Sequence, residues 1–332
     1  MVSEGNNDRI VPATREWISE AAEIIKSGGL VAFPTETVYG LGANGLDEKA
    51  VQKIFEAKGR PQDNPLILHV SGIRDAMRYA EVNETAEALM HSFWPGPLTI
   101  IMYAACQADV EDIVPAITRA NLGTVALRAP LHPVAISLIE LAGLPIAAPS
   151  ANRSGRPSPT TACAVADDLG GSVALILDAG PTTIGLESTV VDVTRDAVAI
   201  LRPGGVTKEM LAKVVDLFEG DESDLSHRSP GTKHRHYAPD IPLFLWDGEE
   251  RASFEMAKGV RWCYMGLREP PRDLDTSHRK VIFASIDEYA RDLFGKLREF
   301  ESSGGEIIIA ELPDGHNLGG AVRNRLMRAA GS

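Results

Sequence analysis

Cysteine is scarce in this chain, and the positions of its cysteines exclude two common frameworks. Cys106, Cys163 and Cys263 are odd in number, far apart and without C-x-x-C spacing. A disulfide framework needs paired cysteines in a small secreted chain, and a structural zinc site needs closely spaced cysteine or histidine ligands. The sequence therefore predicts neither, and we expect no metal held by dedicated protein ligands.

Long apolar runs and an excess of basic residues are also missing. No run approaches the roughly 18 apolar residues of a membrane span, and residues 1–10 lack the apolar core of a signal peptide. Lys and Arg number 33 against 46 Asp and Glu, a net charge of −13, whereas a nucleic-acid-coating protein needs a basic face. We expect a cytoplasmic protein that does not bind nucleic acid directly.

Helix and strand signals alternate through residues 1–217, which indicates an α/β domain. The expected strands are 30–33, 65–70, 98–103, 124–127, 144–148, 174–177, 189–193 and 198–201. The expected helices are 14–27, 47–58, 74–79, 83–93, 132–142, 160–169 and 207–217, with a glycine-rich connection at 35–44. Because these strands are short and apolar, we expect a mixed, twisted sheet buried between flanking helices.

An acidic, polar stretch at 220–229 has no periodicity and is typical of a linker. Beyond residue 240 the strand and helix signals start again. The strands are expected at 242–246, 260–264, 280–283 and 306–310, and the helices at 287–302 and 318–330. We expect a first domain over 1–217, a linker over 218–240 and a smaller Rossmann-like α/β domain over 241–332.

The stretch Gly40 to Gly45 matches the G-x-G-x-x-G pattern of dinucleotide-binding loops but lacks its context. That fingerprint directly follows a strand, whereas the clear strand here ends at Pro34. The sequence also has no G-x-x-x-x-G-K-[ST] loop. Any bound nucleotide must therefore be held by other residues.

Two polar clusters follow apolar segments. Lys58-Gly59-Arg60-Pro61 ends an amphipathic helix, and Ser150-Ala151-Asn152 follows the apolar strand at 144–148. We expect Lys58 and Arg60 to lie at an exposed helix end. Two cations beside a turn, with a hydroxyl and an amide at a strand end, suit an anionic ligand that carries phosphate.

Seven motifs follow one another along the first domain. They are Phe33-Pro34-Thr35-Glu36-Thr37-Val38-Tyr39-Gly40-Leu41, Lys58-Gly59-Arg60-Pro61, Asn64-Pro65-Leu66, Trp94-Pro95-Gly96-Pro97-Leu98-Thr99, Ser150-Ala151-Asn152, Glu187-Ser188-Thr189-Val190 and Leu201-Arg202-Pro203-Gly204. In this order they resemble the YrdC-type threonylcarbamoyl-AMP synthases over about residues 13–217. The stretch 229–239 resembles the linker of the longer, two-domain members, and the part that contains Asn324-Arg325-Leu326 resembles their extra C-terminal domain.

The resemblance implies a YrdC-like catalytic domain and a condensation that uses ATP. L-threonine and bicarbonate would form a carbamate, which attacks the α-phosphate of ATP and expels pyrophosphate. The product, L-threonylcarbamoyladenylate, would supply a downstream transferase machinery that modifies tRNA adenosine. Mg²⁺ is expected to bind mainly through the ATP phosphates and water. Such a transfer needs positioning and charge neutralisation more than a protein nucleophile.

The resemblance also implies roles for single residues. Around ATP it places Lys58, Arg60, Asn64, Thr124, Ser150, Asn152, Ser158, Arg202 and Tyr237. Around L-threonine it places Thr37, His69, Arg128, Ala148 and Ser188. Arg128 ends a strand and is the natural bidentate partner of the carboxylate. In the linker, Lys233, Arg235, His236 and Tyr237 are expected to form a lid that keeps water from the adenylate.

Other interpretations stay open. Ser158 could cap the helix that starts near residue 160, Arg202 could form a structural salt bridge, and the linker could be a passive tether. A carbamoyltransferase that handles carbamoyl-adenylates is a rival enzyme, although the cysteine pairs for its usual zinc fingers are missing. An RNA-binding module is the rival from another class, and the acidic charge argues against it.

Overall fold

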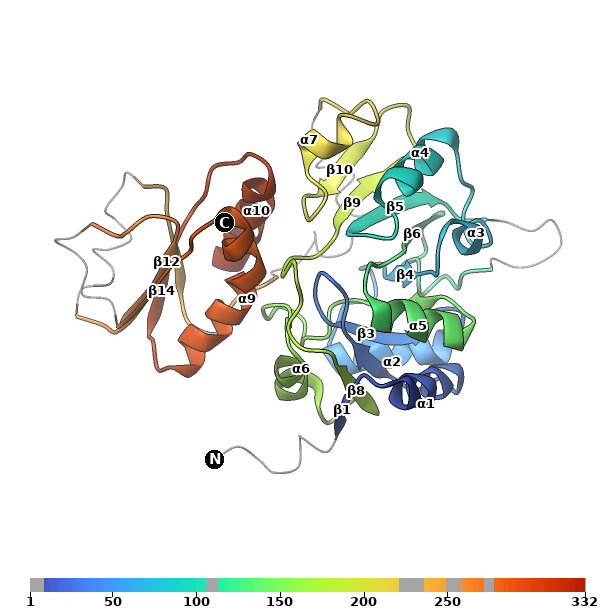
Figure 1. Ribbon diagram of the computed structural model, residues 1–332, viewed down its shortest axis with the longest axis horizontal. Helices are drawn as coiled ribbons and strands as arrows, with labels where there is room; N and C mark the ends of the chain where they lie inside the picture. The colour runs from blue at the N-terminus through green and yellow to red at the C-terminus, as the bar shows by residue number, and fades with distance from the viewer. Residues whose placement is uncertain are drawn as a thin grey trace.

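The computed structural model describes residues 9–105, 113–220, 236–248, 257, 259–271 and 278–331. Figure 1 shows a larger N-terminal body and a smaller C-terminal one, with helices of the smaller body facing the larger. No helix in these described ranges is both long and apolar enough to cross a membrane.

The larger body is built on a mixed sheet of ten strands. In spatial order they are β1 (Ile10–Pro12), β8 (Leu175–Asp178), β2 (Val31–Phe33), β3 (Gly40–Asn44), β7 (Ile146–Ala147), β4 (Ile67–His69), β6 (Thr124–Arg128), β5 (Leu98–Tyr103), β9 (Thr189–Asp192) and β10 (Ala199–Arg202). The pairs β1/β8, β2/β8, β4/β6 and β5/β9 are parallel, and the other neighbours are antiparallel. The predicted mixed α/β sheet is confirmed.

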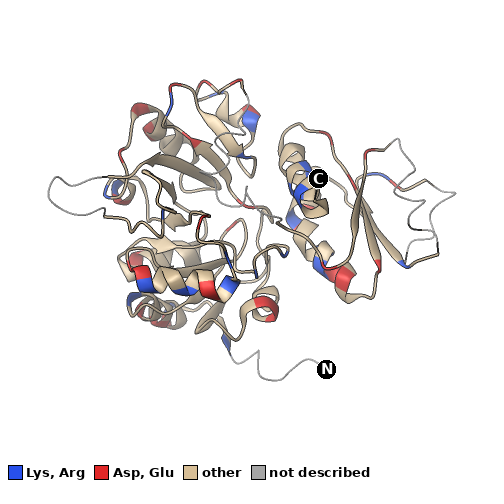
Figure 2. Ribbon diagram, turned by 180° about the vertical axis from the view of Figure 1, so that it is seen from behind, with Lys and Arg blue, Asp and Glu red and all other residues tan. Residues whose placement is uncertain are grey.

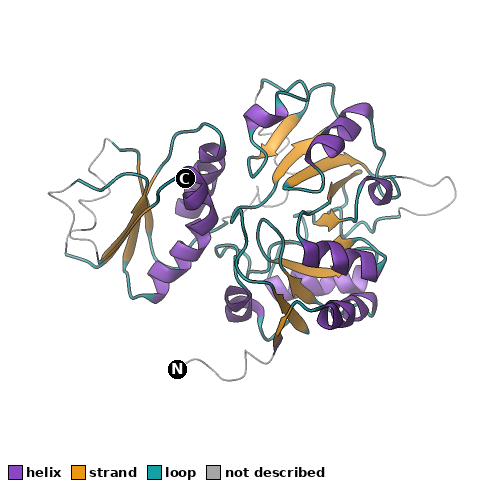
Figure 3. Cartoon of the chain, in the orientation of Figure 1, coloured by secondary structure: helices purple, strands orange, loops and turns teal. Residues whose placement is uncertain are grey.

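Helices flank this sheet (Figure 3). They are α1 (Arg15–Lys26), α2 (Glu48–Lys58), α3 (Ile73–Ala76), α4 (Glu84–Phe93), α5 (Pro133–Ala142), α6 (Ala162–Leu169) and α7 (Lys208–Leu211). The first helix begins where Thr14 accepts a hydrogen bond from the amide of Trp17. Similarly, Asp47 caps α2, and Gly59 ends it with φ of 60°, a left-handed conformation that glycine adopts without steric cost.

The fold differs from the expectation in three details. Residues 40–44 form β3 instead of a connection. The chain packs tightly around Gly42, where a Cβ would lie 2.8 Å from the Phe33 ring and 2.9 Å from Ile146. The glycine therefore allows close packing within the sheet. The helix expected at 207–217 ends at Leu211, and the polar start of the chain contains β1, which was not anticipated.

The smaller body is a parallel sheet of four strands, as expected of a Rossmann-like unit. Its spatial order is β11 (Leu243–Trp246), β14 (Ile307–Glu311), β12 (Trp262–Gly266) and β13 (Arg279–Ile282). Two long helices, α9 (Ile286–Ser302) and α10 (Leu318–Ala330), lie between this sheet and the larger body (Figure 1).

The two bodies meet through an apolar seam, defined here as Val38, Leu186 and Tyr237. These three buried side chains belong to the same packed cluster as the core of the C-terminal domain. Gly185, beside the seam, has φ of 79°, and a Cβ there would lie 2.1 Å from the backbone oxygen of Arg291 on α9. The backbones of the two domains therefore approach as closely as a residue without a side chain allows.

Candidate active site

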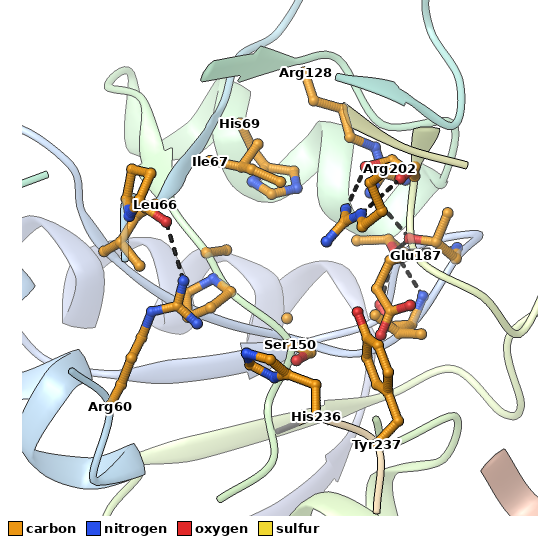
Figure 4. Close-up of a pocket in the computed structure, with 18 residues that line it drawn as sticks. Arg60, Leu66, Ile67, His69, Arg128, Ser150, Glu187, Arg202, His236 and Tyr237 are labelled. Atoms are coloured by element: carbon orange, nitrogen blue, oxygen red, sulfur yellow. Dashed lines mark hydrogen bonds between the residues drawn. The ribbon is translucent and has the colours of Figure 1, made fainter. Parts of the chain in front are cut away.

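A cavity opens where the ends of several strands of the large sheet meet the last residues of the linker (Figure 4). It is lined by Thr35, Thr37, Val38, Gly40, Arg60, Pro65, Leu66, Ile67, His69, Arg128, Ala148, Pro149, Ser150, Glu187, Ser188, Arg202, His236 and Tyr237. Its free volume is about 60 Å³, well below the 300 Å³ or more of small-molecule sites. A large ligand would therefore need part of this lining to move.

Most residues predicted for the site are brought together here. Ten of them line the cavity: Thr37, Arg60, His69, Arg128, Ala148, Ser150, Ser188, Arg202, His236 and Tyr237. Lys58, Asn152 and Ser158 are buried directly behind this lining, bonded to residues that form it or flank it. Asn64 accepts a hydrogen bond from Arg60 through its backbone oxygen. Thr124 starts β6, at the opposite end from Arg128, and does not line the cavity.

The linker is only partly within the described ranges. Lys233 and Arg235 lie outside them, so the predicted lid can be followed only from His236 onwards. Figure 4 shows His236 and Tyr237 side by side at the cavity, with Arg60 to one side and Arg202 to the other. Tyr237 is buried and has φ of 66°.

Lys58 and Arg60 do not lie at an exposed helix end, so that expectation is wrong. Both are buried, because the turn after α2 folds under the Ser150–Asn152 cluster. Lys58 donates to the backbone oxygens of Ser150 and Asn152, and burial lowers its pKa well below the ordinary value. The two polar clusters identified in the sequence thus touch, and Lys58 joins them.

Arg60 and Arg202 are buried cations on opposite sides of the cavity (Figure 4). Arg60 donates from Nε and Nη2 to the backbone oxygens of Asn64 and Pro65, at 3.3 and 3.0 Å. Burial, reinforced by the nearby cation of Arg202, lowers the pKa of Arg60 to about 10. The pKa of Arg202 is lowered too, first by burial. Like charges that are buried near each other cost free energy unless an anion joins them, so the space between Arg60 and Arg202 is suited to phosphate.

Near Arg202, the cavity wall contains a guanidinium with fixed orientation, that of Arg128 (Figure 4). Arg128 donates from Nη1 to Thr37 Oγ1 at 2.9 Å and from Nε to the backbone oxygen of Gly96 at 3.3 Å. Its Nη2 lies 2.7 Å from Oε1 of Glu36, an ion pair without hydrogen-bond geometry, and both side chains are 5% exposed. A planar cation held in this way can present donors to a small carboxylate.

His69 lies between Arg60 and Arg128 (Figure 4) and is neutral. It is 3% exposed, and its Nδ1 has no hydrogen-bond partner. Burial, and then the nearby charge of Arg128, lower its pKa to about 3. A neutral imidazole with a vacant ring nitrogen can bond to a hydroxyl or an amine.

Acid should destabilise the fold through His69. Its folded pKa of about 3 lies below the unfolded value of about 6.5, so the unfolded state binds more protons between these pH values. The free energy of unfolding is then expected to fall by about 1.4 kcal/mol per pH unit as the pH drops from about 6 to about 4. Urea unfolding at several pH values measures this slope. His69→Gln should reduce it, whereas the same change at exposed His91 should not.

The sequence did not lead us to predict a functional role for three residues at the site. Glu36, Glu187 and Arg325 all occur within quoted motifs, but only neighbouring positions were given roles. Glu187 lines the cavity and accepts hydrogen bonds from Ser158 and from Arg325. Ser158 is therefore not a helix cap, and Thr161 caps α6 instead. Their positions within these motifs were the signal that could have identified them.

Metal ligation by protein alone is not seen in this site. Within the described ranges no three His, Cys, Asp or Glu side chains are grouped to hold a metal ion. The two carboxylates near the cavity are each paired with an arginine, Glu36 with Arg128 and Glu187 with Arg325.

Comparisons with known proteins identify the family of this chain. A family model described as Telomere recombination (Sua5_yciO_yrdC) matches residues 23–204, and one described as Threonylcarbamoyl-AMP synthase, C-terminal domain, matches residues 206–331. Curated relatives named threonylcarbamoyl-AMP synthase include those of Pyrococcus abyssi, 43% identical over 95% of each chain, and Bacillus subtilis, 44% identical over 95% of this chain and 93% of the relative. The crystal structure of P. abyssi Sua5 complexed with L-threonine matches with a TM-score of 0.87 and 42% identity over 97% of each chain. This chain therefore belongs to the threonylcarbamoyl-AMP synthase family of enzymes, in its two-domain form.

Proposed function

We propose that this enzyme makes L-threonylcarbamoyladenylate from L-threonine, bicarbonate and ATP, with release of pyrophosphate. The observation that carries the proposal is one cavity bordered by the fixed guanidinium of Arg128 and by the buried cations of Arg60 and Arg202. The carboxylate of an amino acid suits Arg128, and a triphosphate suits Arg60 and Arg202. A relative of the same fold, the P. abyssi protein, is described as a complex with L-threonine.

At the amino-acid end, Arg128 binds the threonine carboxylate, and Thr37 and Ser188 supply hydroxyls on either side of the substrate. Neutral His69 accepts from, or donates to, the threonine hydroxyl, and Ala148 lines the same wall. The amine, once deprotonated, attacks the carbon of bicarbonate. A C–N bond forms, water leaves, and the product is the N-carboxylate of threonine.

At the nucleotide end, Arg60 and Arg202 neutralise the triphosphate, and Lys58, Asn64, Ser150, Asn152 and Ser158 fix the loops around it. Thr124 lies outside the present lining, so it would contact the nucleotide only after the site rearranges. A carbamate oxygen attacks the α-phosphorus, the bond between the α- and β-phosphates breaks, and pyrophosphate leaves. Fixed cations favour the charge that develops on the phosphates.

Magnesium enters this scheme with ATP. Because the carboxylates at the cavity are already paired with arginines, we expect Mg²⁺ to be coordinated mainly by phosphate oxygens and water. The ion would supply charge neutralisation on the phosphates.

The linker is proposed to be the lid. His236 and Tyr237 fill space at the cavity, so they must move before ATP enters, and on returning they would exclude water from the labile adenylate. The product is then passed to a transferase machinery that modifies tRNA. This assigns the enzyme to the cytoplasm and requires no direct binding of nucleic acid.

The proposal is tested by incubating the purified chain with ATP, Mg²⁺, bicarbonate and single amino acids. We expect pyrophosphate release that depends on threonine, and an adenylate with the mass of threonylcarbamoyl-AMP. Equal turnover with serine or glycine would show that the substrate is wrong. Turnover with carbamoyl phosphate instead of threonine would favour the carbamoyltransferase, and salt-dependent tRNA binding without ATP would favour the RNA-binding module.

A further inference from the structure

A fully buried cation of the C-terminal domain lies directly behind the wall of the active site. Arg325, on α10, is 0% exposed and donates from Nε to Glu187 Oε2 at 2.7 Å. Its Nη1 donates to the backbone oxygen of Pro203, at 2.9 Å. Glu187 lines the cavity, and Pro203 directly follows Arg202, so one guanidinium reaches two segments of the site.

The same guanidinium also contacts the lid. The guanidinium carbon of Arg325 lies 5.3 Å from the centre of the Tyr237 ring. Phe294, on α9, stacks on that ring, with centroids 5.3 Å apart and an interplanar angle of 29°. Cation–π contacts and stacked aromatic pairs both stabilise a fold, and a cation–π contact is stronger when it is shielded from water. The C-terminal domain thus supplies both aromatic and cationic partners of Tyr237.

The charge of Arg325 also favours the ionised form of the Glu187 carboxyl. Burial alone raises the pKa of a carboxyl, yet the pKa of Glu187 is lowered, because Arg325, Arg202 and the hydroxyl of Ser158 favour its charged form. If Arg325 were absent, Arg202 would be the remaining cation for this carboxylate. An internal pairing of Arg202 with Glu187 would then compete with phosphate for the same guanidinium.

We propose that Arg325 is a positioning residue for the nucleotide: it pairs with Glu187, so that this carboxylate competes less with phosphate for Arg202, and it holds Tyr237 in place over the site. The C-terminal domain would then set the affinity for ATP, while the threonine end depends on the first domain. Figure 2 shows further Lys and Arg positions along the C-terminal helices, and Arg325 is the position on these helices whose described contacts include Glu187. This inference rests on the proposed function only in naming ATP as the nucleotide.

The main test compares Arg325→Ala with the wild type in full-length protein. We expect the KM for ATP to rise about 10- to 100-fold, as when a charge-assisted hydrogen bond is lost, and the KM for threonine to change less than about twofold. Arg323→Ala is the matched control. It removes an arginine two positions earlier on the same helix, whose Nη1 lies 3.3 Å from the Pro313 oxygen, far from the cavity.

Two further variants separate positioning from simple loss of folding. Phe294→Leu keeps an apolar side chain but removes the ring that stacks on Tyr237, so it should raise the KM for ATP without touching Glu187. Arg325→Ala in a Tyr237→Ala background should add less than about half of its single effect, because contacting residues are not additive. Equal changes in both KM values, or fully additive effects, would overturn the proposal.

Calorimetric titration with ATP tests the inference independently of the reaction. Wild type that binds ATP but makes no threonylcarbamoyl-AMP would refute the proposed function alone. Unchanged ATP affinity in Arg325→Ala, with the melting temperature preserved, would refute this inference alone.

Discussion

Replacing Arg60 by alanine is expected to lower adenylate formation about 100- to 1,000-fold, the usual effect of removing one fixed stabiliser of developing charge. The expected melting temperature is unchanged or higher. Burial lowers the pKa of Arg60 to about 10, so holding it charged at neutral pH costs free energy of folding. If Arg60 binds phosphate as proposed, this cost is offset by the bound anion.

The matched control for this prediction is Arg74→Ala, which removes an exposed arginine on α3. Rates come from pyrophosphate release, and melting temperatures from calorimetry with and without ATP. ATP should raise the melting temperature of the wild type and of the control more than that of Arg60→Ala. Normal turnover in Arg60→Ala would remove this arginine from the phosphate site, and a large loss of stability would make it structural.

Replacing Arg128 by lysine is expected to raise the KM for threonine about 10- to 100-fold, which corresponds to the 1.5–3 kcal/mol of a charge-assisted hydrogen bond. The charge stays, but a single ammonium cannot reach Thr37, Gly96 and Glu36 while it also pairs with a carboxylate. The KM for ATP should change little, because the buried cations at the phosphate end are untouched.

Arg119→Lys is the control for Arg128→Lys. Arg119 is also buried and also donates to backbone oxygens, those of Val114 and Leu122, but it does not line the cavity. We expect it to lower the melting temperature without separating the two KM values. If Arg128→Lys weakens ATP and threonine to the same extent, Arg128 does not recognise the amino acid.

The sequence could predict those parts of the fold and site that leave a local pattern. The helix starts near residues 14 and 47 were predicted, and Thr14 and Asp47 cap these helices in the structure. The clusters around Arg60 and Ser150 stood out as polar residues after apolar runs. The contact between Lys58 and Ser150 joins residues 92 positions apart, and the family motifs were what placed them in one site.

Other features have no local pattern. Arg325 and Glu187 are 138 residues apart, and a charged residue on an amphipathic helix usually faces water, so nothing nearby indicated a buried ion pair. The strand at 40–44 was not predicted because glycines are rare in strands. The need for glycine at position 42 comes from the close approach of Phe33 and Ile146, which are distant from it in the local pattern. The burial of Lys58 and Arg60 depends on tertiary packing in the same way.

The apolar seam of Val38, Leu186 and Tyr237 has a consequence for how such a chain can change over generations. Val38 lies inside a motif of the first domain, yet it packs within the core cluster of the second. Close-packed neighbours must change together, so a substitution at the seam restricts which C-terminal domains remain compatible. An exchange of C-terminal domains between relatives would succeed only where the shapes on both sides of the seam match. Where both domains are present, the seam thus ties the shape of one to the shape of the other, although each has its own sheet.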